Sequence, residues 1–189
     1  MPIQILWGND LNSQNIFIQK LIDKEVPKEW EEINVTNLNG DDDEQVNKAF
    51  DEVLTPPFGD GYRIVTLKNN PIFTAKNEYL STKFEKIHDN IPQNTYFILQ
   101  NTKKPDSRLK STKFLQKLIK KNLANEKSFY LPEIWDYEGQ KRFLEDTANE
   151  MNIKIDKNAA ELIIVSIGND SFKLINELAK AKTYLSALS

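Results

Sequence analysis

The chain has 189 residues, of which 39% are hydrophobic and 28% are charged, and its formal net charge is −3 at pH 7. This composition supports a folded core, and the slight acidity is not typical of an autonomous nucleic-acid binder. Because there is no cysteine, disulfides, thiolate catalysis and cysteine-ligated metals are excluded. No apolar run reaches the roughly 20 residues of a membrane helix, and we expect a cytoplasmic protein without a secretory signal or a membrane partner.

In chain order, the first 131 residues alternate between strand patterns and helix patterns. The predicted elements are a strand at 3–7, a helix at 11–24, a strand at 32–38, a helix at 43–54, a strand at 62–67, a helix at 74–90, a strand at 95–100, a helix at 111–123 and a strand at 127–131. The apolar strand at 95–100 indicates burial on both faces. The alternation predicts an α/β fold, a three-layer sandwich with a mainly parallel five-stranded sheet.

After residue 132 the strand patterns stop. Three helices are predicted at 136–151, 156–167 and 170–186. Asp136, Asp156 and Asp170 each precede one of these helices, where an aspartate caps free backbone N–H groups. We therefore expect two domains: an α/β domain over 1–132 and a small helical domain over 133–189.

Residues with catalytic or metal-binding chemistry are sparse. His88 is the only histidine, and its place at a predicted helix end favours a surface or capping role. The acidic run 41–44 lacks the alternating ligands and the glycine of a calcium loop, so we interpret it as a solvated helix start. We expect no catalytic residue, no metal and no cofactor.

A parallel α/β domain followed by a small helical domain is the layout of the AAA+ ATPases. A phosphate-binding loop needs glycines, a lysine and a Ser or Thr for magnesium, but "WGNDLNS" (7–13) has one glycine, no lysine and an acidic Asp10. The predicted strand ends offer no acidic pair for a metal. Phe172 stands where an ATP-sensing arginine would be. We predict no nucleotide hydrolysis, although a degraded nucleotide-binding enzyme stays an alternative that Mg-ATP titration would test.

The chain resembles the delta subunits of the bacterial DNA polymerase III clamp loader. The segments that carry the resemblance are "ILWGND" (5–10), "LTPPFGDGYRIVTLKN" (54–69), "TYFILQNTKKPDSRLKSTKFLQK" (95–117) and "NIKIDKNAAELIIVSIGNDSFKLINELAKA" (152–181). Together they cover essentially the whole chain in order. The chain departs from the pattern at Phe172 and in "FGDGYR", which is one residue longer than the family's turn.

The resemblance implies an AAA+-like fold that does not hydrolyse ATP, in a non-catalytic accessory subunit that binds the sliding clamp and helps to open it. The implied partners are the sliding clamp (beta subunit), the gamma/tau and delta prime subunits, and primed DNA within the complex. Family members carry a third, C-terminal collar domain. We expect that this chain corresponds to the first two domains only.

The candidate clamp-binding residues are Leu54, Pro57 and Phe58. Pro56 and Pro57 end the predicted helix and stiffen the backbone, and the following glycines turn the chain into the next strand while Phe58 projects. An alternative hypothesis is that Phe58 folds back into the core of its own domain.

A second candidate function is DNA contact, because basic residues gather at 103–121 in an otherwise acidic chain. The candidate contacts to DNA or to a neighbouring subunit are Lys103, Lys104, Arg108, Lys110, Lys113 and Lys117. On a helix, the later lysines share one broad face opposite Leu115 and Leu118. A solvated helix face is the alternative interpretation.

Overall fold

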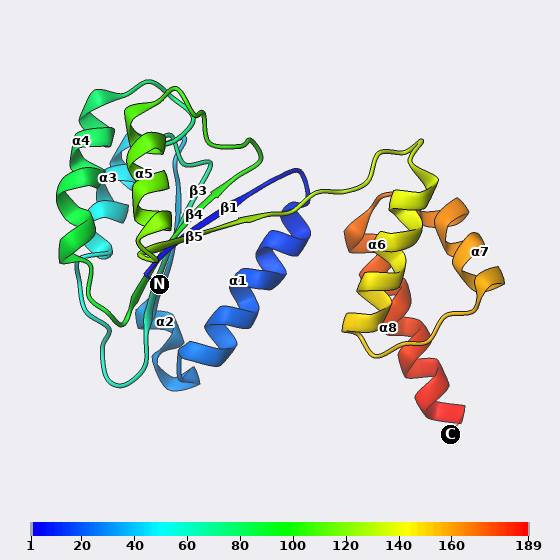
Figure 1. Cartoon of the computed structure of the whole chain (residues 1–189). Coiled ribbons are helices and arrows are strands. Elements are labelled where there is room, and N and C mark those ends of the chain that lie inside the picture. The colour runs from blue at the N-terminus through cyan, green and yellow to red at the C-terminus, as the bar shows by residue number, and fades with distance from the viewer. Residues whose placement is uncertain (1, 189) are drawn as a thin grey trace. The chain divides into compact units, whose positions relative to one another are not determined.

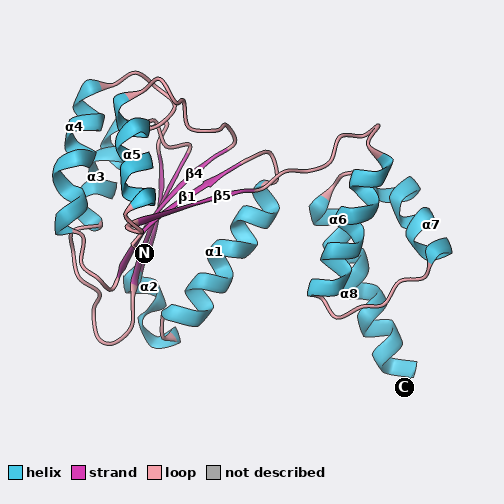
Figure 2. Cartoon of the chain, viewed as in Figure 1, coloured by secondary structure: helices cyan, strands magenta, loops and turns pink. Residues whose placement is uncertain are grey.

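The computed structural model describes residues 2–188, which form two compact units that divide between residues 129 and 130. The first unit holds the five strands and the second is helical (Figures 1 and 2). None of the helices within residues 2–188 is long and apolar enough to cross a membrane.

The centre of the first unit is a five-stranded sheet in which every pair of neighbours is parallel. The strands are β1 (Ile3–Trp7), β2 (Val35–Asn39), β3 (Arg63–Lys68), β4 (Thr95–Asn101) and β5 (Ala124–Ser128), in the order β2-β3-β4-β1-β5. The register aligns Ile5 with Leu99 and Val65 with Phe97. The predicted α/β fold with a parallel five-stranded sheet is confirmed.

Helices cover both faces of this sheet, because the connections after β2, β3 and β4 lie on one face and the connection after β1 lies on the other (Figure 1). The helices of this unit are α1 (Leu11–Glu25), η1 (Lys28–Trp30), α2 (Glu31–Asn34), α3 (Asp43–Glu52), α4 (Glu78–Ile87), η2 (His88–Asn90) and α5 (Lys110–Lys120).

Two apolar clusters fill the space between the sheet and its helices. On the α3–α4–α5 face, Phe50, Phe84 and Leu115 pack with residues such as Phe97. On the α1 face, Ile18 and Ile22 pack with Leu6, Ile64 and Ile98. Successive residues of β4 contribute to opposite clusters, as the two-residue period of a strand requires. The sheet is therefore a rigid base for the loops at its two edges.

Among the element boundaries that differ from the prediction, three differ for a clear physical reason. Residues 31–34 form the short helix α2 rather than the start of a strand. Helix α4 begins at Glu78 rather than at 74, since the Asn77 side chain caps the N–H of Leu80 at 3.1 Å. Strand β5 is the segment Ala124–Ser128 and not the apolar run at 127–131. Its sequence is polar because it is an edge strand with four exposed residues.

The second unit is a three-helix cluster that follows Phe129. Its helices are α6 (Tyr137–Glu150), α7 (Lys157–Ile167) and α8 (Ser171–Leu188). Asp136 and Asp156 cap α6 and α7, and Asp170 accepts the N–H of Lys173 at 3.0 Å. The buried side chains that join the helices are Leu144, Ala148, Ile153, Ala160, Ile164, Leu174 and Leu178. The predicted helical region after the sheet is confirmed.

Candidate functional site

The segment 54–62, which we call the tip, connects the end of α3 to the start of β3. Because it enters a parallel strand, it lies at the edge of the sheet where the strands begin (Figure 1, below the sheet and beside α2). Helix α3 ends at Glu52, and the N–H groups of Leu54 and Thr55 close its last turn. Pro56 and Pro57 follow and cannot continue a helix.

Phe58 is the most exposed large apolar side chain of the tip. It is 56% exposed, Leu54 is 36% exposed, and Pro57 is half-buried. The Phe58 ring meets the Trp30 ring edge-to-face, with 4.8 Å between the centroids and 69° between the planes. Phe58 thus lies outside the two clusters of the sheet and rests on a single aromatic neighbour of the α1–β2 connection.

The backbone of Phe58 is held by a buried asparagine that the sequence analysis did not single out. Asn34, at the end of α2, is fully buried, and its Oδ1 accepts the Phe58 N–H at 2.8 Å while its Nδ2 donates to the Phe58 carbonyl at 2.9 Å. No local sequence pattern indicates that Asn34 binds the Phe58 backbone, since the two residues are 24 positions apart. The segment "EINV" (32–35) has the pattern of a strand.

Two glycines allow the tip to pass close to the α1–β2 connection. Gly59 has a φ of +66°, and a Cβ there would lie 2.6 Å from the Nε1 of Trp30. Gly61 has a φ of +92°, and a Cβ there would lie 2.5 Å from the Cδ of Pro27. A side chain at either position would meet both backbone strain and a steric contact.

The ion pair between Arg63 and Glu52 holds together the elements next to the tip. Arg63, the first residue of β3, is buried, forms an ion pair with Glu52 at the end of α3, and donates to the carbonyl of Ile33 in α2 at 3.3 Å. One guanidinium therefore ties the two elements that the tip connects, α3 and β3, to α2, because its fixed fork of donors can bond two acceptors at once.

The turn after β1, where a phosphate-binding loop would lie, is filled by the protein's own groups. Gln14 is fully buried, and its Nε2 donates to the carbonyls of Gly8 and Asn101 at 2.9 and 3.2 Å. A Cβ on Gly8, whose φ is +127°, would lie 1.9 Å from the Phe129 carbonyl oxygen. Asp10 caps α1 through the Ser13 N–H at 3.0 Å. Gln14 Nε2 and Asp10 are thus used for internal bonding, while Gln14 Oε1 and Asn12 Nδ2 are buried without a hydrogen-bond partner among the described residues.

The six candidate basic residues lie in the β4–α5 connection and on α5. Lys103 and Lys104 follow the end of β4, and the Lys104 ammonium lies 5.2 Å from the centroid of the Trp7 ring. Lys113 and Lys117 are exposed along α5. The loop residues occupy the edge where the parallel strands end, which is opposite to the edge that carries the tip. The two candidate sites are therefore separate.

The remaining two basic residues have acidic neighbours. Arg108 Nη2 lies 2.6 Å from Asp106 Oδ2, and Lys110 Nζ lies 3.4 Å from Glu85 Oε2. Hydrogen bonds from the Arg108 side chain and N–H lower the pKa of Asp106 to about 2. At neutral pH this pair partly neutralises the start of the basic segment, so Lys113 and Lys117 are the better candidates for contact with phosphates.

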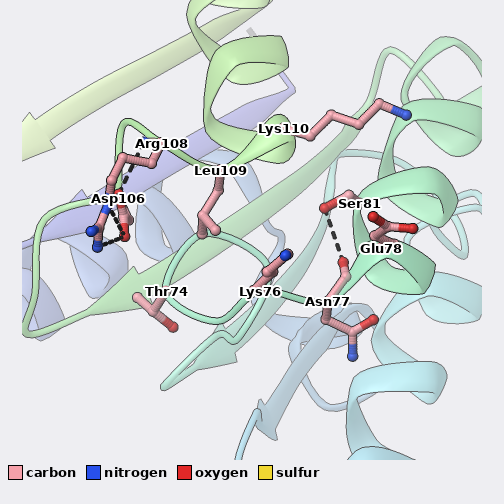
Figure 3. Close-up of a pocket in the computed structure, with 9 residues that line it drawn as sticks. All are labelled: Thr74, Lys76, Asn77, Glu78, Ser81, Asp106, Arg108, Leu109 and Lys110. Atoms are coloured by element: carbon pink, nitrogen blue, oxygen red, sulfur yellow. Dashed lines mark hydrogen bonds and ion pairs between the residues drawn. The ribbon is translucent and has the colours of Figure 1, made fainter.

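The connections into α4 and α5 also enclose a cavity of about 610 Å³ (Figure 3). Its lining residues are Thr74, Lys76, Asn77, Glu78, Ser81, Asp106, Arg108, Leu109 and Lys110. The Arg108 side chain turns back to Asp106, and Ser81 donates to the Asn77 carbonyl at 3.0 Å. Both acidic and basic side chains line the cavity, and Arg108 is paired with Asp106.

Two further features from the sequence have structural roles. His88 is the C-cap of α4, its Nδ1 lies 2.7 Å from the Glu85 carbonyl oxygen, and its ring meets Phe114 edge-to-face. Asp42 caps α3, and the Gln45 side chain and two backbone N–H groups lower its pKa. Within residues 2–188, no three His, Asp or Glu side chains are grouped so that they could hold a metal ion.

The fold and the tip define a class of protein: a parallel α/β unit followed by a helical unit, with an anchored apolar surface turned to solvent. Comparison with known families narrows this class. The sequence model of "DNA polymerase III, delta subunit" matches residues 5–127, which is more than half of the chain. The chain belongs to the DNA polymerase III delta subunit family.

One solved structure agrees with this assignment at the level of the fold. The clamp loader delta protein YqeN from Bacillus subtilis superposes with a TM-score of 0.81 at 20% identity, over 98% of this chain and 54% of that one. A gamma subunit-related protein from Thermotoga maritima has a TM-score of 0.47 at 16% identity, covering 94% of this chain and 53% of its own. The chain thus spans about half the length of these structures. No curated protein matches it.

Proposed function

We propose that this chain is the clamp-binding part of a clamp-loader delta subunit and that the tip is its contact with the sliding clamp. The observation that carries the proposal is Phe58: a large apolar side chain more than half exposed, on a backbone that two hydrogen bonds hold in place. Family membership supports the clamp-loader role.

The tip has the physical properties of an interface anchor. An aromatic side chain that enters a partner's apolar pocket is a common hot spot, and truncating it costs at least about 2 kcal/mol of binding. Leu54 and Pro57 flank Phe58 and extend the apolar surface. The anchored backbone limits the entropy lost on docking. Opening of the clamp would follow from this grip when the chain acts with its other subunits.

The remaining assignments follow from the proposed role. The chain acts without catalysis of its own, as an accessory subunit beside gamma/tau, delta prime and primed DNA in the cytoplasm. The turn after β1 supports a role without nucleotide, since the Gln14 Nε2 and the Asp10 carboxylate bond to groups of the protein itself.

DNA contact is a second candidate function. The exposed lysines Lys113 and Lys117 lie on the outer side of α5, away from Leu115 and Leu118, which are buried. Evenly spaced ammonium groups on one helix face suit the phosphates of a DNA backbone, although the chain as a whole is acidic. This surface could serve together with the tip, because the two regions do not overlap.

The proposal is tested by binding of the purified chain to the sliding clamp from the same source, measured by surface plasmon resonance. We expect saturable binding by the wild-type chain. A matched control is Phe172→Ala, which removes another exposed aromatic side chain but from the second unit, and which should bind like the wild type. Absence of binding at tens of micromolar clamp would contradict the proposal.

A further inference from the structure

Asn34 pairs with Phe58 as a neighbouring β-strand would. Its side-chain amide offers a carbonyl oxygen and an N–H group, the same pair that a peptide bond offers. Both are used on one residue: the Phe58 N–H donates to Oδ1 at 2.8 Å, and the Phe58 carbonyl accepts from Nδ2 at 2.9 Å. Two residues that exchange both bonds form the hydrogen-bonded pair of an antiparallel ladder. Here one side chain supplies the two bonds that a paired residue of a neighbouring strand would supply.

This contact differs from ordinary loop bonding. The backbone groups of an exposed loop are usually satisfied by water or by near neighbours in sequence. Those of Phe58 are satisfied by a buried residue 24 positions away. Because the two bonds hold the N–H and the carbonyl on either side of the Phe58 Cα, they fix the direction in which the side chain leaves the backbone.

We propose that Asn34 is the positioning residue of the tip: it holds Phe58 in its binding conformation before the partner arrives, an inference that rests on the proposed function of Phe58. Trp30 completes the arrangement, since its edge-to-face contact at 4.8 Å restricts the orientation of the ring. A side chain ordered in advance loses less conformational entropy on association, which strengthens binding without any contact between Asn34 and the partner.

The structure allows Asn34 to be changed without releasing α2. Arg63 holds this helix independently through the Ile33 carbonyl and pairs with Glu52. A matched control is Asn70, which is also a buried asparagine whose Oδ1 accepts a backbone N–H, that of Ile72 at 3.2 Å. Asn70 follows β3 at the opposite edge of the sheet, so its loss affects folding stability but not the tip.

The test is a double-mutant cycle on Asn34→Leu, Phe58→Ala and the double variant, with Asn70→Leu as control. For each protein, the melting temperature is determined first, and clamp affinity is then measured at a temperature below the unfolding transition. Hydrogen exchange is measured at the Phe58 amide. We expect Asn34→Leu to weaken clamp binding about tenfold, to accelerate exchange at residue 58, and to add nothing when Phe58 is already Ala. Asn70→Leu should lower only the melting temperature.

Two results would overturn the positioning role. One is wild-type affinity in folded Asn34→Leu while Phe58→Ala binds weakly, and the other is additive losses in the double variant. If neither the wild type nor Phe58→Ala binds the clamp, the proposed function fails instead. The exchange measurement still decides the inference in that case, because unchanged protection of the Phe58 amide in Asn34→Leu would contradict it.

Discussion

At the scale of single residues, the tip depends on a glycine that tolerates two constraints at once. Gly59 has a φ of +66°, and a Cβ there would lie 2.6 and 2.7 Å from two atoms of the Trp30 ring. Gly168 has the same φ of +66° but no atom within 4 Å of the position of a Cβ. Gly59 therefore combines backbone strain with a steric contact, whereas Gly168, with a ψ of −132°, has backbone strain alone.

We expect Gly59→Ala to destabilise the first unit by more than the roughly 1–2 kcal/mol that a left-handed backbone alone costs an L-residue. Gly168→Ala should show only the backbone cost in the second unit. The measurement is the free energy of unfolding of each variant in urea, against the wild type. Equal costs at the two positions would mean that Trp30 moves aside freely and does not confine the tip.

At the scale of elements, α5 is the segment whose function depends most on its exposed face. Phosphate contacts release counterions, so each basic group that takes part adds to the salt dependence of binding. Reversing the charge of Lys113 and Lys117 should abolish the weak DNA binding expected at low salt and the salt dependence that goes with it. Fluorescence anisotropy with labelled primed DNA measures both.

The control for this helix is the double reversal of Lys173 and Lys180 on α8. It changes the net charge by the same amount, and these exposed lysines pair only with Asp170 and Glu177, contacts worth little to stability. This control should keep DNA binding. If Lys113→Glu/Lys117→Glu binds as the wild type does, the basic face of α5 is merely solvated.

Elements with strong periodicity were predictable from the sequence, and those determined by distant contacts were not. The helix of α5 follows from apolar residues at helical spacing, and β4 from its continuous apolar run. The polar edge strand β5 has no such pattern, since pairing with β1 decides it. Asn34 and Trp30 gave no signal either, because their roles arise only when residues 30–34 meet the tip. Burial of a side chain against a remote loop cannot be inferred from spacing.

At the scale of the whole molecule, the loops at the two ends of the parallel strands have different roles. The edge where strands end, where nucleotides bind in related layouts, is bonded internally by Gln14, Gly8 and Asn101. The edge where strands begin carries the anchored tip. We expect no saturable Mg-ATP binding at micromolar concentrations in isothermal titration, with a nucleotide-binding protein as positive control in the same buffer. Saturable binding would show that the turn after β1 opens to admit a phosphate.

The central claim is that Phe58 is an anchor for the sliding clamp rather than part of its own domain's core. Measuring clamp affinity and melting temperature on Phe58→Ala, beside Phe50→Ala, tests it most directly, because Phe50 is fully buried on α3. The account predicts that Phe58→Ala loses about 2 kcal/mol of binding, roughly thirtyfold in affinity, with a nearly unchanged melting temperature. Phe50→Ala should instead lose about 3–5 kcal/mol of folding stability. A Phe58→Ala protein that melts early, or that binds the clamp as tightly as the wild type, would contradict the account.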